Sequence, residues 1–496
     1  MRERRARAET LIRVQQERIP HLFIGGLDVE SEGNSTALVL NPANGQPLGR
    51  CPSANARDVE KAVEQARRVS ADGWHHSRPE DRAQLILRLA HALEEESNDL
   101  AILESLQTGR VYRDILRRDI EGGIAALRYF AGWAGKGLGE TVELEHGLGW
   151  VQPEAAAVVG AIVAGTDPFY ATVIRLAPIL ALGGTLVVKP TESAPLTLFR
   201  LGEIAREIGL PPGVLNVISG SASAGEALSL HPDVPVLSFQ GSIETARRVL
   251  NASAKSNLKR VHLELGGKSA HLVFADADTK AAGRAIVRSI FGGGATLGIA
   301  GSRLLIERTI YAEVADLVAA RAREIVVGDP LDEHTELGPL PSEERMKRTL
   351  AYAEQGRREG ATLVAGGGRD REGTKAHGFF VKPTVFVDAK SSMRIWREET
   401  GGPILTIMPF SKEEEAVQLA NDTDYGLAAG IWTKDLTRAH RLTRSLKAGV
   451  IFVNQYGDQS PALPSGGFGL SGQGRELGRA ALSAYALPKS VYLTTR

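Results

Sequence analysis

Cysteine is almost absent from this chain of 496 residues, which contains only Cys51. A single thiol excludes an internal disulfide framework and a metal site built from cysteines, and we predict no metal site. It also means that any catalytic thiol could only be Cys51.

An excess of charge of one sign is absent too, because 59 lysines and arginines balance 59 acidic residues. A nucleic-acid partner would need a basic field, so we predict none. No run of about twenty apolar residues occurs, so we also predict no membrane span. Residues 1–20 are rich in arginine but carry acids and lack an apolar signal core. We expect them to form a charged helical arm on a cytoplasmic protein.

The composition is that of a folded chain, with 43% hydrophobic and 24% charged residues. A chain of 496 residues is too long for one ordinary core, so we expect at least two domains. Helical periodicity covers residues 58–68 and 79–106. From residue 155 onward, apolar strand-like runs alternate with helical stretches; the runs are AAAVVGAIVAG, GTLVVKP, GVLNVIS, PVLSFQGS and LKRVHLELGG. This alternation predicts βαβ units with a buried parallel sheet, and a second α/β region begins after Gly267.

Two strand ends carry residues that could form a nucleotide site, although the usual G-x-G-x-x-G fingerprint is absent. Gly241 and Ser242 lie between a strand and a helix, where free backbone N–H groups suit a pyrophosphate. An ordinary helix cap by Ser242 is the alternative. Lys189 and Glu192 follow another strand and could hold a ribose diol, or form a surface ion pair.

Glu264 ends an apolar strand, directly before a leucine and two glycines. A carboxylate there is poorly solvated, so its pKa should rise, which suits a general base. A glutamate turned outward from a sheet edge is the alternative.

At these positions the chain resembles the aldehyde dehydrogenase superfamily. VHLELGGKSAHLVFADAD is similar to the glutamate motif of that family. Further segments match in order and spacing from about Leu22 to Leu493: LNPANGQPLG, LVVKPTESAPLT, PPGVLNVISG, FQGSIE, GSRLL, EETGGPI, YGLAAGIWT, FVN and PSGGFGLSGQGRELG. The resemblance implies an α/β fold with two Rossmann-like parallel-sheet domains and a small β extension for oligomerisation.

The same resemblance implies domain boundaries. Residues 21–135 and 156–266 would form the NAD(P)-binding domain, and residues 267–465 the catalytic domain. Residues 136–155 and 480–496 would be the oligomerisation strands. Because ALPKSVYLTT alternates like an exposed edge strand, we expect a homodimer or homotetramer.

The family also implies a role for each candidate residue, with an aldehyde as the small-molecule substrate. Glu264 would be the general base. The residues that would bind NAD, or NADP, are Lys189, Glu192, Gly225, Gly241, Ser242, Leu265 and Glu399. Lys189 and Glu192 would hold the adenosine ribose, and Glu399 the nicotinamide-side ribose. We expect NAD rather than NADP, because Glu192 would repel a 2′-phosphate.

The likeness ends at the nucleophile, for which the family uses a cysteine thiolate. Gly298 stands at that position, so the usual thiol-dependent oxidation should be absent or strongly impaired. The oxyanion-holding asparagine corresponds to Thr166, and the aromatic beside the nicotinamide to Gly401. Cys51 lies far from this site in the family's layout, so we expect a structural thiol. Two further replacements are Thr296, for a glutamine, and Ala246, for a glycine.

Three hypotheses of function stay open. A hydrated aldehyde, an alcohol or a hemiacetal could pass hydride directly to NAD, with Glu264 as the base and Thr166 or Arg175 holding the oxygen. A different reaction could use the same cleft, with Asp167 as an acid or base unless it is only a turn residue before Pro168. The chain could also be a pseudoenzyme with a binding or structural role.

Overall fold

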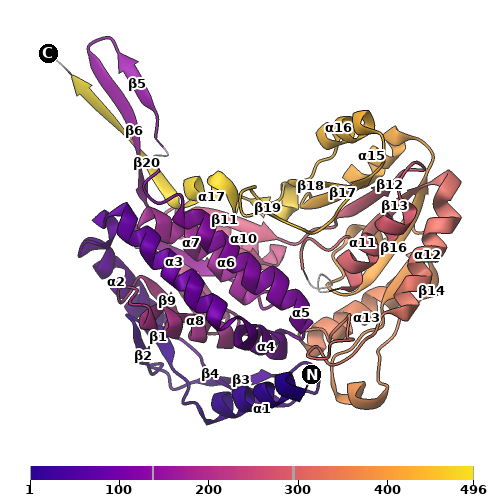
Figure 1. Ribbon diagram of the computed structural model, residues 1–496, viewed down its shortest axis with the longest axis horizontal. Coiled ribbons are helices and arrows are strands. Elements are labelled where there is room, and N and C mark those ends of the chain that lie inside the picture. Colours follow the sequence, from indigo (N-terminus) through magenta and orange to yellow (C-terminus); the bar gives the residue numbers. More distant parts are fainter. Residues whose placement is uncertain (1, 137–138, 293–296, 495–496) are drawn as a thin grey trace.

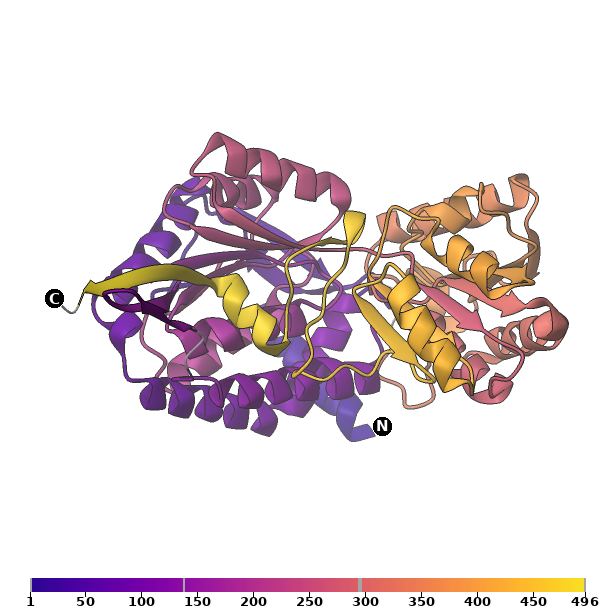
Figure 2. The same ribbon diagram turned by 90° about the horizontal axis from the view of Figure 1, so that it is seen from above.

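The computed structural model describes residues 2–136, 139–292 and 297–494. Two α/β lobes lie side by side, and a narrow β arm projects from the first of them (Figure 1). Seen from above, the C-terminal part of the chain leaves the second lobe and returns to the first (Figure 2). The sheets of the two lobes position the candidate functional residues.

The first lobe is built on a sheet with eight strands among the described residues, in the order β19-β11-β10-β7-β8-β9-β1-β2. These strands are β1 (Leu22–Ile24), β2 (Leu27–Val29), β7 (Val158–Ile162), β8 (Thr185–Lys189), β9 (Leu215–Val217), β10 (Val236–Gly241), β11 (Arg260–Leu265) and β19 (Gly472–Gln473). The strands from β11 to β9 are parallel. After β7 the chain adds β8 and β9 on one side and then β10 and β11 on the other. Open α/β sheets bind ligands at such a reversal, outside the carboxyl ends of the strands.

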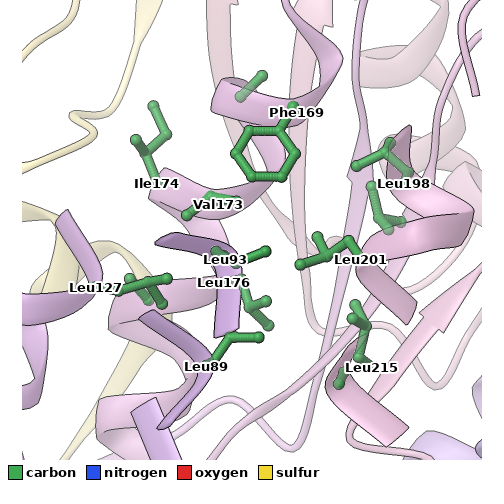
Figure 3. Close-up of a cluster of buried hydrophobic side chains, with 14 of the residues drawn as sticks. Leu89, Leu93, Leu127, Phe169, Val173, Ile174, Leu176, Leu198, Leu201 and Leu215 are labelled. Atoms are coloured by element: carbon green, nitrogen blue, oxygen red, sulfur yellow. The ribbon is translucent and has the colours of Figure 1, made fainter. Parts of the chain in front are cut away.

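Helices cover both faces of this sheet. They are α2 (Ala56–Ala71), α3 (Pro79–Glu95), α4 (Ser97–Thr108), α5 (Tyr112–Asp114), the π-helical η2 (Ile115–Ile120), α6 (Glu121–Ala131), α7 (Pro168–Leu182), α8 (Leu196–Glu207), α9 (Ala222–Leu230), α10 (Ile243–Lys255) and α17 (Gly478–Tyr485), with the short η1 (Trp74–His76). Figure 3 shows the core on one face, where Leu93 of α3, Leu127 of α6, Phe169 of α7 and Leu201 of α8 are fully buried. Each such side chain contributes about 1.5–3 kcal/mol by leaving water. Helices α2, α9 and α10 cover the other face.

The single helix expected over residues 79–106 is two helices, α3 and α4. They are separated at Glu96, whose backbone (φ −97°, ψ 9°) departs from helical geometry. The Glu96 carboxylate pairs with Arg200 of α8. Apolar periodicity continues through the break because both helices contact α8, so the pattern alone does not reveal it.

The second lobe has a seven-stranded sheet, counted over the described residues, in the order β14-β15-β16-β13-β12-β17-β18. Its strands are β12 (Ala270–Val273), β13 (Arg303–Glu307), β14 (Thr362–Ala365), β15 (Thr384–Val387), β16 (Ile404–Phe410), β17 (Ala428–Trp432) and β18 (Val450–Val453). Its helices are α11 (Thr279–Phe291), η3 (Arg308–Ile310), α12 (Tyr311–Glu324), α13 (Glu343–Arg358), η4 (Gly373–His377), α14 (Arg394–Arg397), α15 (Glu413–Asn421), α16 (Leu436–Ser445) and η5 (Gly469–Ser471). Only β14 is antiparallel to its neighbour. The α/β fold with two parallel-sheet lobes is therefore as predicted.

The projecting arm is an antiparallel sheet of β5 (Thr141–Leu144), β6 (Gly147–Ala155) and β20 (Ala486–Thr494). Within the described chain β20 pairs only with β6, which leaves its other edge open. The helix predicted over the first twenty residues is α1 (Arg2–Glu17), which packs against α4 and against β4 (Pro47–Pro52), the partner of β3 (Thr36–Leu40). None of the helices described here is both long and apolar enough to cross a membrane.

Candidate functional site

A cleft of about 570 Å³ opens where the first sheet reverses its winding, between the ends of β7, β10 and β11 and the second lobe. The residues singled out from the sequence that line it are Thr166, Asp167, Gly241, Ser242, Glu264, Leu265, Gly298 and Glu399. These residues are far apart in the sequence, and the packing of the two lobes brings them together. In the described part of the chain, no group of three or more His, Cys, Asp or Glu side chains could hold a metal ion.

Ser242 begins α10 at the wall of this cleft. Its hydroxyl accepts a hydrogen bond from the Thr245 N–H at 3.3 Å, so Ser242 is a helix cap. Ile243 and Glu244 also line the cleft, and the first N–H groups of a helix lack partners within it. A Cβ on Gly241 would lie 2.7 Å from the Phe239 ring, so a side chain there would displace that ring. The helix N-terminus is thus open to an anion.

Lys189 and Glu192 lie at the carboxyl end of β8 and are not among the residues that line the cleft. The Lys189 Nζ donates to the Pro190 carbonyl oxygen at 3.1 Å, and burial lowers the pKa of this amine to about 8. The Glu192 carboxylate accepts a hydrogen bond from the Ser53 hydroxyl. No ion pair joins Lys189 to Glu192 within the described residues, so the surface ion pair considered as the alternative is wrong. Gly225 packs against the Lys189 stem, where its Cβ would lie 3.6 Å from Cδ.

Cys51 of β4 lies beside Glu192 and not at the cleft. Its side chain is fully buried and its Sγ donates to the Glu192 carbonyl oxygen at 3.4 Å. Burial raises the pKa of this thiol to about 11, so it stays protonated at neutral pH. A protonated and enclosed thiol is a structural residue, as expected.

Glu264 forms an ion pair with Arg175 of α7, which is not among the residues that line the cleft. The Arg175 Nη2 lies 2.7 Å from Glu264 Oε2, and its Nε lies 3.3 Å from Oε1 of Glu476, a second carboxylate of the cleft. The Glu264 side chain remains 31% exposed, toward the cleft. Burial raises the pKa of Glu264, and the Arg175 charge opposes this only in part. The predicted rise is confirmed, and the outward-turned alternative is wrong.

Arg175 itself is buried too deeply to hold a substrate oxygen. It has no exposed surface, and its donors are used by Glu264, by the Ser238 hydroxyl at 2.7 Å and by the Ala171 carbonyl oxygen at 2.6 Å. The suggestion that Arg175 contacts the substrate is therefore wrong. Its contacts instead fix the orientation of the Glu264 carboxylate.

Thr166 and Asp167 belong to a closed network of hydrogen bonds. The Thr166 hydroxyl donates to Asp167 Oδ1 at 2.9 Å, so its proton is already used. Asp167 also accepts from Gln240 at 3.1 Å and from Arg118 at 3.0 Å. Burial acts in the opposite direction, but Arg118 and Arg110 lower the pKa of Asp167. An ionised, fully bonded carboxylate is a poor proton donor, which argues against an acid role for Asp167.

Gly298 lies against the end of the strand that carries Glu264. A Cβ there would meet the Leu265 carbonyl oxygen and the Leu427 side chain, each at 3.3 Å, and the Gly266 Cα at 3.4 Å. Neighbours that shift by a few tenths of an ångström would admit a small side chain. Thr296, singled out above, lies outside the described residues, and Ala246 is buried on α10.

Glu399 reaches the cleft from the second lobe, and its carboxylate packs so close to Gly266 that a Cβ there would overlap it. Burial raises the pKa of Glu399, while Arg345 and Lys268 oppose the rise. Gly401 has a left-handed backbone (φ +73°), and a Cβ there would overlap Nη1 of Arg345. The space beside Gly401 is thus filled by a guanidinium.

Comparison with known proteins identifies the family of the chain. The family model described as "Aldehyde dehydrogenase family" matches residues 29–491. The chain belongs to the aldehyde dehydrogenase family. It is 40% identical over 489 residues to a phenylacetaldehyde dehydrogenase from Pseudomonas fluorescens. The aligned residues cover 96% of each chain.

Solved aldehyde dehydrogenases share the whole fold. The NAD+ complex of an aldehyde dehydrogenase from Bacillus cereus superposes with a TM-score of 0.95 at 36% identity, covering 98% of both chains. A mutant of an indole-3-acetaldehyde dehydrogenase from P. syringae, in complex with NAD+, gives a TM-score of 0.95 at 38% identity, covering 99% of both chains. The fold predicted from the family resemblance is confirmed.

Several residues that line this cleft are not predicted from the sequence. Glu476 lies in a segment that the resemblance already used, RELG, but nothing in the spacing places it beside Arg175. Arg118 lies in a run of charges, RRD, that is typical of a solvated helix face. Arg345 and Arg348 are on α13, which carries charged residues along its length. Only the packed lobes single out these four side chains.

Proposed function

We propose that the chain is an NAD-linked oxidoreductase that oxidises a hydrated aldehyde without a covalent enzyme intermediate. The observation that carries this proposal is the pairing of Glu264 with Gly298 in a cleft that holds no thiol, since Cys51 is enclosed elsewhere. NAD is proposed because the related aldehyde dehydrogenases from Bacillus cereus and P. syringae are NAD+ complexes.

The residues present fit a dinucleotide. The open N-terminus of α10 would face the pyrophosphate, and Lys189 with Glu192 would face the adenosine ribose. Glu399 would face the nicotinamide-side ribose. Gly225 and Gly266 let Lys189 and Glu399 lie close to the backbone, since a Cβ on Gly225 would lie 3.6 Å from the Lys189 Cδ and one on Gly266 would overlap the Glu399 carboxylate. NAD, when bound, supplies the hydride acceptor.

The substrate in this proposal is a gem-diol, R–CH(OH)₂, which already carries the oxygen that water would otherwise add. Glu264 takes the proton of one hydroxyl as the C–H hydride leaves carbon. The products are the carboxylic acid, NADH and one proton, so atoms and electrons balance. A carboxylate whose pKa is raised by burial is suited to this step.

A catalytically inactive binding protein is the second candidate. It is favoured by the closed network at Thr166, whose hydroxyl is bonded to Asp167, and by the buried donors of Arg175. The Thr166 hydroxyl is already bonded and Arg175 is fully buried, so neither presents a donor to a developing oxyanion, and one such donor is worth about 2.7–4 kcal/mol.

The test is NADH formation with a panel of aldehydes, alcohols and hemiacetals, beside calorimetry with NAD. NAD binding with turnover that depends on Glu264 supports the proposed reaction, and Glu264→Gln is expected to abolish it. NAD binding without turnover on any aldehyde, alcohol or hemiacetal supports the second candidate. Absence of NAD binding contradicts both the cofactor and the oxidoreductase assignment.

A further inference from the structure

A second cavity of about 280 Å³ adjoins the cleft on the side away from α10. The two hollows share five lining residues, namely Arg118, Tyr170, Leu297, Ile299 and Gln459. The second cavity continues past them toward η2 and α11, where Arg117 and Arg288 line it. The second cavity therefore offers room for the remaining atoms of a molecule whose reacting carbon lies beside Gly298.

Arg118 presents a cation to the junction of the two hollows. Its side chain is 30% exposed, and it lies over the Tyr170 ring with 4.7 Å from Cζ to the ring centroid. The two acids that pair with it, Asp119 and Asp167, are only 0% and 4% exposed. These carboxylates raise the pKa of Arg118 although burial opposes them, so the guanidinium stays charged. The guanidinium of Arg118 is therefore more exposed at the junction than either carboxylate that pairs with it.

Two more arginines stand at the outer end of the second cavity. Arg117 pairs with Asp458 at 3.4 Å, and both side chains are more than half exposed, at 59% and 73%. Exposed pairs of this kind contribute little and exchange readily with another anion. The guanidinium of Arg288 is exposed and makes no hydrogen bond or ion pair with any residue that the structure describes. Arginines thus line the second cavity at both ends, and they outnumber the two acids that line it, Asp114 and Asp458.

We propose that the substrate carries an anionic group, a carboxylate or a phosphate, at the end opposite its aldehyde. This substrate class rests on the proposed function, because it takes the reacting carbon to lie beside Gly298. Arg117 and Arg288 attract the anion, and Arg118 binds it at the junction. Charge-assisted hydrogen bonds from a planar guanidinium suit both carboxylate and phosphate oxygens. An apolar tail, such as an aromatic ring, would instead displace water from Arg118, Arg117 and Arg288 without offering any of them a hydrogen-bond acceptor.

The first experiment measures binding without NAD, so that no turnover interferes. Calorimetry compares succinic semialdehyde with butanal, which has the same number of carbons but no charge. Glyceraldehyde 3-phosphate is compared with glyceraldehyde, which separates a phosphate preference from a carboxylate preference. The expected result is at least tenfold tighter binding of one anionic member over its neutral partner, with an advantage that shrinks as salt is added. Equal affinities in both pairs, or tighter binding of phenylacetaldehyde, would overturn the proposal.

The second experiment assigns the preference to the arginines. Arg288→Gln is expected to reduce the anionic-to-neutral affinity ratio about three- to fivefold, because it removes an exposed cation. Arg284→Gln is the matched control, since Arg284 is exposed one turn earlier on α11 and lines neither hollow. Equal effects of the two variants, or none from Arg288→Gln, would overturn the proposal.

Arg118→Gln is expected to abolish the preference but removes the ion-pair partner of Asp167 and leaves Asp119 with Arg110, so thermal unfolding must accompany it. If this variant does not fold, Arg288→Gln and the salt series still decide the outcome. These binding results are separate from activity. A protein that forms no NADH yet prefers the anionic ligand contradicts the proposed reaction and supports the charge preference.

Discussion

Lys189 is a buried cation whose charge depends on pH near neutrality. Burial lowers the pKa of its amine to about 8, and the charge of nearby Glu192 opposes this only in part. The protonated amine is the better donor to a ribose hydroxyl. Affinity for NAD should therefore be highest below pH 8 and should fall as the pH rises through that value.

Calorimetric titration of NAD between pH 6.5 and 9.5 checks this. Lys189→Ala should weaken binding by about 1–3 kcal/mol at pH 7, the range for a hydrogen bond to a charged group, and should remove most of the pH dependence. Lys189→Arg, whose charge does not titrate here, is the control for the effect of charge. An unchanged pH profile in Lys189→Ala would show that another group is responsible.

Gly298 and Thr166 are expected to act together in any recovery of thiol chemistry. A Cβ at Gly298 would have its nearest neighbours at 3.3–3.4 Å, so Gly298→Cys should fold. It should restore little turnover by itself, because the Thr166 hydroxyl is bonded to Asp167 and leaves the oxyanion without a donor worth about 2.7–4 kcal/mol. Gly298→Cys with Thr166→Asn should exceed either single variant.

NADH formation by the wild type and these three variants measures the effect. Equal activity of Gly298→Cys and the double variant would exclude Thr166 as the missing oxyanion partner. A covalent acyl adduct on the wild type, detected by mass spectrometry with an activated ester, would contradict the absence of a nucleophile.

The sequence predicts the burial of a single residue, and the direction of its pKa shift, where these depend only on its position at the end of a strand. Glu264 ends an apolar strand, so its raised pKa follows from burial. Its contact with Arg175 could not be predicted, because 89 residues separate the two and only the packing of α7 under the sheet joins them. For the same reason, the sequence does not predict that the Arg345 guanidinium fills the space beside Gly401.

Glu104 acts at the scale of elements, because it joins three helices. It lies on α4, accepts a hydrogen bond from the Phe169 N–H of α7 at 3.1 Å, and accepts another from the Thr197 hydroxyl of α8 at 2.6 Å. Burial raises its pKa from 4.5 to about 7, so the folded state favours the neutral form. Its contribution to stability is fully present below its unfolded pKa and is lost as the pH rises through 7.

The measurement is the free energy of unfolding of the wild type and Glu104→Gln from pH 4 to 8. The wild type should lose up to about 3 kcal/mol relative to the variant over this range, from the size of the pKa shift. The variant also changes a hydrogen bond, but that adds a constant offset and no slope. Parallel pH profiles would show that Glu104 is already ionised in the folded protein.

The bounds of a helix or strand are predicted best where a residue that ends the element stands at the end of its hydrophobic pattern. The strands LVVK and VHLEL are found within a residue or two because a lysine or a glycine pair ends them. The break between α3 and α4 is missed because Glu96 is a good helix former, and its ion pair with Arg200 forms only in the folded lobe.

At the scale of the whole molecule, the two lobes make a cleft that neither contains by itself. The first lobe supplies Glu264, and the second supplies Glu399 and Arg345. Family resemblance predicts that Glu264 and Glu399 belong to one site, but it does not predict Arg345. Nor does it predict the second cavity or the arginines that line it, because these depend on how η2 and α11 approach each other.

The arm of β5, β6 and β20 leads to the last prediction, that the protein is a homodimer or homotetramer. The arm exposes large apolar side chains, namely Val142, Leu148, Leu487, Tyr492 and Leu493, and the outer edge of β20 is unpaired within the described chain. Exposed apolar side chains beside an open strand edge are a liability that assembly removes. A second copy of the chain covers such a surface by symmetry.

Light scattering at micromolar concentration should therefore give a multiple of the 53.1 kDa chain mass. Tyr492→Glu with Leu493→Lys should shift the protein toward the monomer, because it places charges in the expected interface. Leu436→Glu is the control, since Leu436 is 72% exposed on α16 and lies away from the arm. A wild type that is monomeric at 53.1 kDa, or an arm variant that assembles as the control does, would show that the arm does not join subunits.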